Sequence, residues 1–321
     1  MLSNHRCLLP AALLVTLLAG CAAPNVTKPP ATPSARPTVA AAAPAVPTAT
    51  AAPTLAASPA PTQDPAHITD AHGAQMTLIP AGEFTMGSDQ GFPDELPIHQ
   101  VYLNSFYIDT LEVTNRQYED CVEAGGCKPP FRTDCCSLDQ QTPRPVYFGD
   151  PKFDQYPVTW LSWTQGKTYC TWRGARLPTE AEWEKAARGT DARTYPWGND
   201  DPTPNRLSFT WKPNEFGFKS PYGTMPVGSY QLGASPYGIL DMAGNVYEWV
   251  SDIYDPGYYA ISPHDNPKGP ASGIYRIARG GSFYNTAFRN RASNRNYDAF
   301  LKADDAEFDS GVRCAADAPR S

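Results

Sequence analysis

Six cysteines carry the clearest chemistry in this chain. They are Cys121, Cys127, Cys135, Cys136, Cys170 and Cys314. An even number of cysteines in an exported domain predicts disulfides, whereas a dense group of four can also indicate zinc. Zinc ligands usually come in pairs two to four residues apart, and the first four cysteines lack that spacing. We therefore expect disulfides, and because a bond between neighbours is strained, Cys135 and Cys136 should each pair with Cys121 or Cys127.

A charged segment near the C-terminus is a second candidate. Its five arginines are Arg276, Arg279, Arg289, Arg291 and Arg295, and five acidic residues with one lysine follow between Asp298 and Asp309. One interpretation is a cationic groove for an anionic or carbonyl-rich ligand. The other, which we favour, is that the two blocks pair and brace the loops. Ser282 lies between these arginines without a histidine suited to act as its base, so a structural role is favoured over a nucleophilic one.

The elements that must position these residues are short. Capping residues predict three helices, from Thr114 or Asn115 to about Ala124, from Ser162 to Trp172, and from Thr179 to Gly189. Alternating apolar residues over 98–109 predict a strand with an irregularity between Leu103 and Phe106. The remainder is punctuated by Gly, Pro and Asn. These patterns predict an α+β domain with little regular secondary structure.

Composition excludes several classes of protein. The chain has 321 residues, 18% of them charged, and a net charge of −7. Binding to nucleic acid usually needs a clustered excess of Lys and Arg, so we expect no nucleic-acid partner. No apolar run reaches the roughly 20 residues that cross a bilayer, which argues against a channel or transporter.

The first 65 residues predict an anchor and a tether. Residues 1–21 combine Arg6, an apolar run and the sequence Leu18-Ala19-Gly20-Cys21, which resembles a bacterial lipobox. That resemblance implies a lipoprotein signal peptide, lipid on Cys21, and anchoring to a membrane of the cell envelope, facing outside the cytoplasm. Residues 22–65 contain 11 Pro and 15 Ala and predict a disordered linker. Residues 66–321 form the domain.

Several blocks follow one another in a fixed order through this domain. They are 79–87 (IPAGEFTMG), 106–109 (FYID), 112–115 (EVTN), 157–160 (PVTW), 176–184 (RLPTEAEWE), 195–198 (YPWG), 241–249 (DMAGNVYEW), 279–283 (RGGSF) and 311–315 (GVRCA). In this order they resemble the sulfatase-modifying factor family, whose best-known member is the formylglycine-generating enzyme. The resemblance covers residues 75–317 and implies a variant of the C-type lectin fold.

The resemblance implies an activity whose chemical groups are missing here. In the family, two thiols after the Gly-Gly-Ser block bind copper and oxidise a sulfatase cysteine to formylglycine with oxygen. The corresponding positions are Asn285 and Asn290. Cu(I) prefers thiolate ligands, so neither copper nor this oxidation is expected. The residues expected in the cleft are Ser282, Asn285, Arg289, Asn290 and Arg291.

The resemblance also implies a calcium site and a disulfide. The loop before the Glu-Trp pair holds calcium in the family, and its matching residues are Asp241, Gly244, Val246 and Glu248. Two carboxylates with intervening carbonyls suit this hard cation, although the carboxylates could instead bind amides of their own loop. Cys170 and Cys314 match a disulfide of the family.

These observations favour an extracytoplasmic binding or accessory module that lacks the copper-thiol chemistry. Its partner would be a protein or glycan ligand at the cell surface, and its membrane contact would be the lipid anchor. The alternative is an oxidoreductase that modifies a protein cysteine with another metal or a different set of residues. Resemblance in fold does not decide between them.

Overall fold

The computed structural model describes residues 66–134, 146–210, 223–295 and 301–319, and the statements below concern these ranges. Cys21, the linker, Cys135 and Cys136 lie outside them. The helices are α1 Asn115–Glu123, α2 Trp163–Trp172 and α3 Glu180–Arg188, with five short 3-10 turns η1 Pro93–Glu95, η2 Pro151–Phe153, η3 Gln231–Gly233, η4 Tyr258–Ala260 and η5 Ala287–Asn290. None of the described helices is long and apolar enough to span a bilayer.

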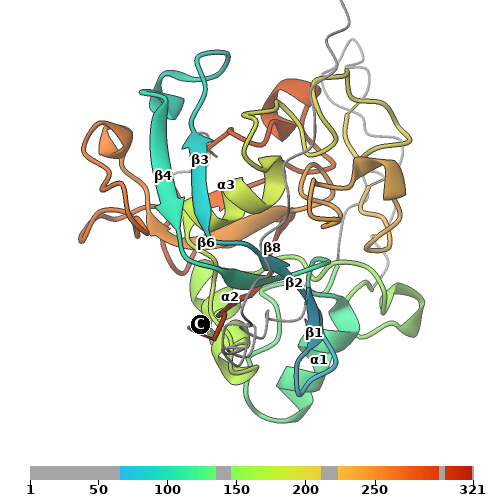
Figure 1. The fold of residues 1–321 in the computed structure, drawn as a ribbon. Coiled ribbons are helices and arrows are strands. Elements are labelled where there is room, and N and C mark those ends of the chain that lie inside the picture. The colour runs from blue at the N-terminus through green and yellow to red at the C-terminus, as the bar shows by residue number, and fades with distance from the viewer. Residues whose placement is uncertain (1–65, 135–145, 211–222, 296–300, 320–321) are drawn as a thin grey trace, which may run out of the picture. The chain divides into compact units, whose positions relative to one another are not determined.

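Three small sheets make up the strands (Figure 1). The first runs β1 His67–Thr69, β2 Gln75–Ile79, β5 Phe106–Asp109, β9 Ala315–Asp317; the second pairs β3 Gly82–Met86 with β4 His99–Leu103; the third runs β7 Arg276–Arg279, β6 Tyr247–Ile253, β8 Ser310–Gly311. All neighbouring strands are antiparallel except β6 and β8. The α+β class with short elements is confirmed.

The strand predicted over 98–109 is two strands in different sheets. Leu103 pairs with Gly82 in the second sheet, whereas Phe106 pairs with Ile79 in the first. The irregularity between them is therefore a change of sheet, and it places both side chains in one core.

The predicted helix starts are confirmed. The hydroxyls of Thr114, Ser162 and Thr179 each accept a hydrogen bond from the backbone N–H three residues later, at the first turn of α1, α2 and α3. A Gln or Glu at that later position reaches back to the capping residue, which completes a capping box in each case.

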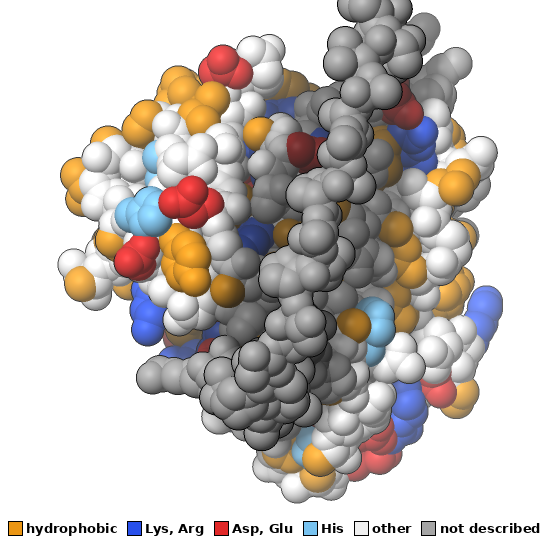
Figure 2. Space-filling model, viewed as in Figure 1, with side chains coloured by type: hydrophobic (Ala, Val, Ile, Leu, Met, Phe, Trp, Pro, Cys, Tyr) orange, Lys and Arg blue, Asp and Glu red, His pale blue; other side chains and the backbone are white. Residues whose placement is uncertain are grey.

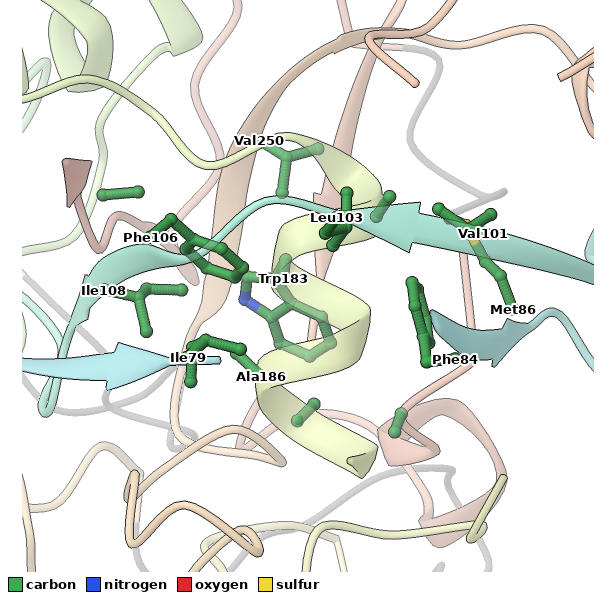
Figure 3. Close-up of a cluster of buried hydrophobic side chains, with 14 of the residues drawn as sticks. Ile79, Phe84, Met86, Val101, Leu103, Phe106, Ile108, Trp183, Ala186 and Val250 are labelled. Carbon is green, nitrogen blue, oxygen red and sulfur yellow. The ribbon is translucent and has the colours of Figure 1, made fainter. Parts of the chain in front are cut away.

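Trp183 of α3 lies in the largest cluster of buried apolar side chains (Figure 3). Phe106 and Ile108 of β5, Leu103 of β4 and Val250 of β6 belong to the same cluster. Helix α3 contacts β3, β4, β6 and β7. A single core therefore joins residues of all three sheets.

Helix α3 is unusual because every one of its residues is buried, including its charged ones. Glu184 binds Arg188 within the helix and Arg279 of β7, at 2.8 and 2.7 Å. The Lys185 ammonium donates to the carbonyl oxygens of Pro80 and Gly82, and burial lowers its pKa to about 8. Because unpaired buried charge is costly, these contacts fix α3 against its surroundings.

Two disulfides are present in the described residues. Cys170 in α2 is bonded to Cys314, 144 residues away, as the family resemblance implies. Cys121 is bonded to Cys127. The prediction that both of these would pair with Cys135 and Cys136 is therefore wrong: the glycine turn after α1 brings Cys127 back to its helix, where its amide donates to the Cys121 carbonyl oxygen.

We expect loss of the Cys170–Cys314 bond, in a Cys170→Ser/Cys314→Ser variant, to lower the free energy of unfolding by roughly 2–5 kcal/mol, because that bond restricts a long loop in the unfolded chain. The Cys121–Cys127 bond joins residues only 6 positions apart. The Cys121→Ser/Cys127→Ser variant is therefore the matched control, with a smaller expected loss of unfolding free energy. Urea unfolding measures both. Equal losses of unfolding free energy, or a larger loss in the control, would contradict the prediction that the long-range bond contributes more to stability.

Asp252 gives a pH-dependent prediction. It accepts a hydrogen bond from the Glu180 amide at the start of α3, and burial, then repulsion by Glu180, raises its pKa from 3.8 to about 7. The folded pKa exceeds the unfolded one, so the stability Asp252 contributes is present at low pH and is lost as the pH rises through about 7. Relative to Asp252→Asn, the unmodified protein should lose up to about 4 kcal/mol between about pH 4 and pH 8.

Urea unfolding of both proteins at several pH values tests this difference, with the exposed substitution Asp304→Asn as control. Parallel stability curves for the unmodified protein and Asp252→Asn would show that Asp252 does not titrate as proposed.

Candidate functional site

The loop over 280–291 follows β7, and its first residues pack closely against its last ones. Gly280 and Gly281 have φ angles of 93° and 71°, a region that favours glycine. A Cβ on Gly281 would lie 1.9 Å from Oδ1 of Asn290, so a larger residue cannot be accommodated without moving that side chain. The Gly-Gly pair thus lets the two ends of the loop meet.

Ser282 and Asn285 bind each other at the start of this loop. The Ser282 amide donates to Oδ1 of Asn285 at 3.0 Å, and the Ser282 hydroxyl lies 2.6 Å from Oδ2 of Asp309. Burial raises the pKa of Asp309 to about 6. Ser282 is itself buried and near no histidine in these contacts, which fits the structural role predicted for its hydroxyl.

Asn290 closes the loop from its other end. Its side-chain amide donates to the carbonyl oxygens of Thr286 and Asn285, at 3.2 and 3.4 Å, and the side chain is fully buried. The structure therefore brings Asn285 and Asn290 together, and both use their amides to hold the backbone of the loop. Neutral amides in these roles supply no thiolate, redox couple or proton acceptor.

The arginines do not form the predicted cationic groove. The Arg291 guanidinium makes two hydrogen bonds to the Glu95 carboxylate, at 2.7 and 2.6 Å, and is buried. Arg279 and Arg295 are buried too, and both bind Glu180 of α3. Figure 2 shows Lys and Arg side chains at several separate places on this face.

The favoured alternative, pairing with the acidic block that follows, is also wrong for these three arginines. Their carboxylate partners come from α3 and η1, elements that precede them by about a hundred residues or more. Arg289 is half-buried with its guanidinium 5.3 Å from the centre of the Phe92 ring, and Arg276 lies 3.9 Å from the Trp163 ring. Of the five expected cleft residues, only Asn285 and Arg289 are partly accessible.

The loop over 241–248 has the backbone of a tight, buried turn. Asp241, Gly244 and Asn245 have φ angles of 58°, 79° and 59°. A Cβ on Gly244 would lie 2.3 Å from the Ser208 carbonyl oxygen, so this position requires glycine. Oδ2 of Asp241 accepts a hydrogen bond from the Gly228 amide at 2.6 Å, and burial raises the pKa of Asp241 to about 6.

Glu248 does not fit the role of a calcium ligand. One of its oxygens accepts hydrogen bonds from the Trp183 indole at 2.6 Å and from Nε of Arg313 at 2.7 Å, and the other accepts from Nη2 of Arg313 at 2.7 Å. Its carboxylate is fully buried in this ion pair. Nη1 of Arg313 donates to the Asp109 carbonyl oxygen, and Nη2, which also binds Glu248, donates to the Leu240 carbonyl oxygen.

Glu112 is a site residue that sequence reasoning missed. Its carboxylate accepts hydrogen bonds from the Val246 amide, at 3.2 Å, and from the Asn245 side chain, at 2.5 Å. Burial raises its pKa well above the ordinary value, and repulsion from Asp241 and Glu248 raises it further. The sequence signal for Glu112 was its position directly before the apolar Val113 and the helix cap Thr114. An exposed carboxylate is not expected there.

The fit to calcium is therefore partial. Over the ranges that the structure describes, no three His, Cys, Asp or Glu side chains are grouped so as to hold a metal ion. Asp241 and Glu112 do offer two buried carboxylates whose negative charge Arg313 only partly offsets. Glu248, whose carboxylate is bound to Arg313, does not suit a hard cation.

Comparison with known proteins places this geometry in a family. The sulfatase-modifying factor enzyme 1-like domain family matches residues 62–318. The serine/threonine-protein kinase pkn1 of Chlamydia pneumoniae is 37% identical over 231 residues, which are 69% of this chain and 35% of the kinase. This chain thus spans about a third of that relative's length. A formylglycine-generating enzyme of Streptomyces coelicolor is 33% identical over 288 residues, covering 75% of this chain and 88% of the enzyme.

Solved structures share the fold. The structure of PvdO from Pseudomonas aeruginosa superimposes with a TM-score of 0.64 at 26% identity, over 80% of this chain and 100% of PvdO. Variable protein 1 of Treponema denticola has a TM-score of 0.60 at 21% identity, over 79% of this chain and 100% of that chain, which shows the fold alone. The formylglycine-generating-enzyme fold, a C-type lectin-like variant, is confirmed. The chain belongs to the sulfatase-modifying factor enzyme 1-like domain family.

Proposed function

We propose that this domain is a binding or accessory module that does not oxidise cysteine to formylglycine. The observation that carries the proposal is the structural role of the Asn285 and Asn290 side chains. Both amides hold the 280–291 loop together through hydrogen bonds to its backbone and to Ser282. Two residues that stabilise a closed loop replace the pair of thiols on which the family's oxidation depends.

No other thiol in the described ranges supports a substitute mechanism. Cys121, Cys127, Cys170 and Cys314 are all bonded in disulfides. A disulfide sulfur lacks the thiolate charge that binds Cu(I), and neutral asparagine amides are poor ligands for this soft ion. These features favour the binding module over the alternative, an oxidoreductase with a different residue set.

We also propose that the domain works outside the cytoplasm. The two disulfides support this location, because such bonds persist in oxidising compartments. Lipid on Cys21 would anchor the chain to a membrane of the cell envelope, and residues 22–65 would hold the domain away from it. The ligand would then be a protein or glycan at the cell surface.

The first test asks for oxidation directly. We expect no conversion when the purified protein is incubated with Cu(I), oxygen, a reductant and a peptide that carries the cysteine motif of a sulfatase. The physical reason is the absence of the thiol pair at Asn285 and Asn290. Mass spectrometry of the peptide detects formylglycine by its mass.

An Asn285→Cys/Asn290→Cys variant is the matched comparison. Conversion by this variant alone would indicate a substrate cleft that lacks only its catalytic thiols. Conversion by the unmodified protein would overturn the proposal and establish the oxidoreductase alternative.

Calcium is a second proposal, supported by the buried charge around the 241–248 loop. Asp241 and Glu112 would hold the ion with backbone oxygens of Gly244 and Val246, while Glu248 stays paired with Arg313. An ion there would offset the repulsion between the carboxylates and so stabilise the loop.

Addition of EGTA should lower the melting temperature by several degrees, because an ion bound only to the folded state stabilises it by mass action. Asp241→Asn should remove this sensitivity, whereas Asp201→Asn, at an exposed position, should keep it. Differential scanning calorimetry measures all three proteins. An EGTA-insensitive melting temperature in the unmodified protein would rule out the site.

A further inference from the structure

A groove of about 1040 Å³ lies apart from both loops discussed above. It is bounded by α2, by the turn from β4 to β5, by the start of α3 and by the segment after β9. None of its lining residues belongs to 280–291 or 241–248. Asp317, Ala318 and Pro319, at the C-terminal end of the described chain, also line the groove.

Both walls of the groove are fixed by regular contacts. Trp163, Lys167 and Thr171 are spaced four residues apart along α2, so they share one face of the helix. On the opposite wall, the Asn266 amide donates to the Tyr102 carbonyl oxygen at 2.8 Å, and the Asn104 amide donates to Oδ1 of Asn266 at 2.9 Å. The groove is therefore preformed, which reduces the entropic cost of binding.

The rims of the groove carry positive charge without acidic partners. Lys167 on one wall and Lys268 on the other are exposed, and neither forms an ion pair with any described residue. Arg276 does not itself line the groove, but its guanidinium lies over the ring of Trp163, which does, and it pairs with no acid in the described ranges. The acidic residues that line the groove, Glu182 and Asp317, both bind Arg176, so the two lysines remain to bind an anionic ligand.

The floor holds one cation that a ligand can reach. Arg176 is bound to the nearly buried Glu182 at 2.7 Å and to Asp317 at 2.6 Å. The Asp317 side chain is 83% exposed, so its bond to Arg176 is a solvated surface pair of low net strength. A carboxylate of a ligand can therefore replace Asp317 at little cost.

Size and lining favour a polypeptide over a sugar chain. At about 1040 Å³ the groove is at the upper end of the usual range for small ligands, and its accessible apolar lining is Ala81, half-buried Tyr102 and Pro319. Stacking on sugar rings needs open aromatic faces. Trp163 is 9% exposed with Lys167 and Arg276 over its ring, and Phe106 is 2% exposed, which leaves only half-buried Tyr102.

We propose that this groove binds an extended acidic peptide segment of a partner protein. Carboxylates of the peptide would lie at Lys167 and Lys268 on the two rims, and its apolar side chains would contact Ala81, Tyr102 and Pro319. The inference rests on the proposed function, that the domain is a binding module, and it names the site and the class of ligand.

A displayed library of random decapeptides, selected on the full-length protein, tests this assignment. We expect the enriched peptides to contain at least two acidic residues together with apolar ones, and their affinity to fall with added NaCl. In a Lys167→Glu/Lys268→Glu variant, the dissociation constant of the best peptide should rise at least tenfold. Lys302→Glu, an exposed lysine outside the groove, is the charge-matched control and should leave the affinity unchanged.

Three outcomes would overturn the inference: no enriched peptide, enriched peptides without acidic residues, or equal binding by the groove variant and the control. If the enriched peptides bind the groove variant as tightly as the unmodified protein, the domain is still a binding module, but its binding site lies elsewhere. The peptide oxidation assay on the same preparations separates failure of this inference from failure of the proposed function, because only formylglycine formation contradicts the latter.

Discussion

The pairing of buried charges around α3 is the constraint on which the rest of this domain depends. Glu180 binds both Arg279 and Arg295, and Glu184 binds both Arg279 and Arg188. A buried ion left without its partner costs several kcal/mol, so each segment that carries an arginine must reach one position relative to the helix. The loop over 280–291 lies between two such segments, so its ends are fixed by contacts other than its own hydrogen bonds.

This constraint also explains how the loop over 280–291 is held in place without a thiol. Arg279 and Arg295 hold its flanks, Arg291 is bound to Glu95, and the Gly280-Gly281 pair allows the close approach of Asn290. None of these contacts involves a thiol. Asparagine at the two thiol positions adds hydrogen bonds to a framework that other residues already determine.

Sequence reasoning succeeded where the physical cause is local. Thr114, Ser162 and Thr179 mark helix starts because a capping hydroxyl and the amide it accepts from lie three residues apart. The ordered blocks identified the fold and the Cys170–Cys314 bond. It failed where partners are distant: Glu95 and Arg291 are 196 residues apart, and Glu112 and Val246 are 134 residues apart. The arginines were expected to pair with the acidic block that follows them in sequence. They pair instead with distant carboxylates of α3 and η1.

Arg313 and Cys314 give the domain an order of assembly. They follow, in the direction of synthesis, every segment that they join: the Glu248 carboxylate, the Asp109 and Leu240 carbonyl oxygens, and the thiol of Cys170. Until these two residues leave the ribosome, the carboxylates of Glu112, Asp241 and Glu248 lack their common counter-ion. The domain therefore cannot complete its core before synthesis reaches Cys314.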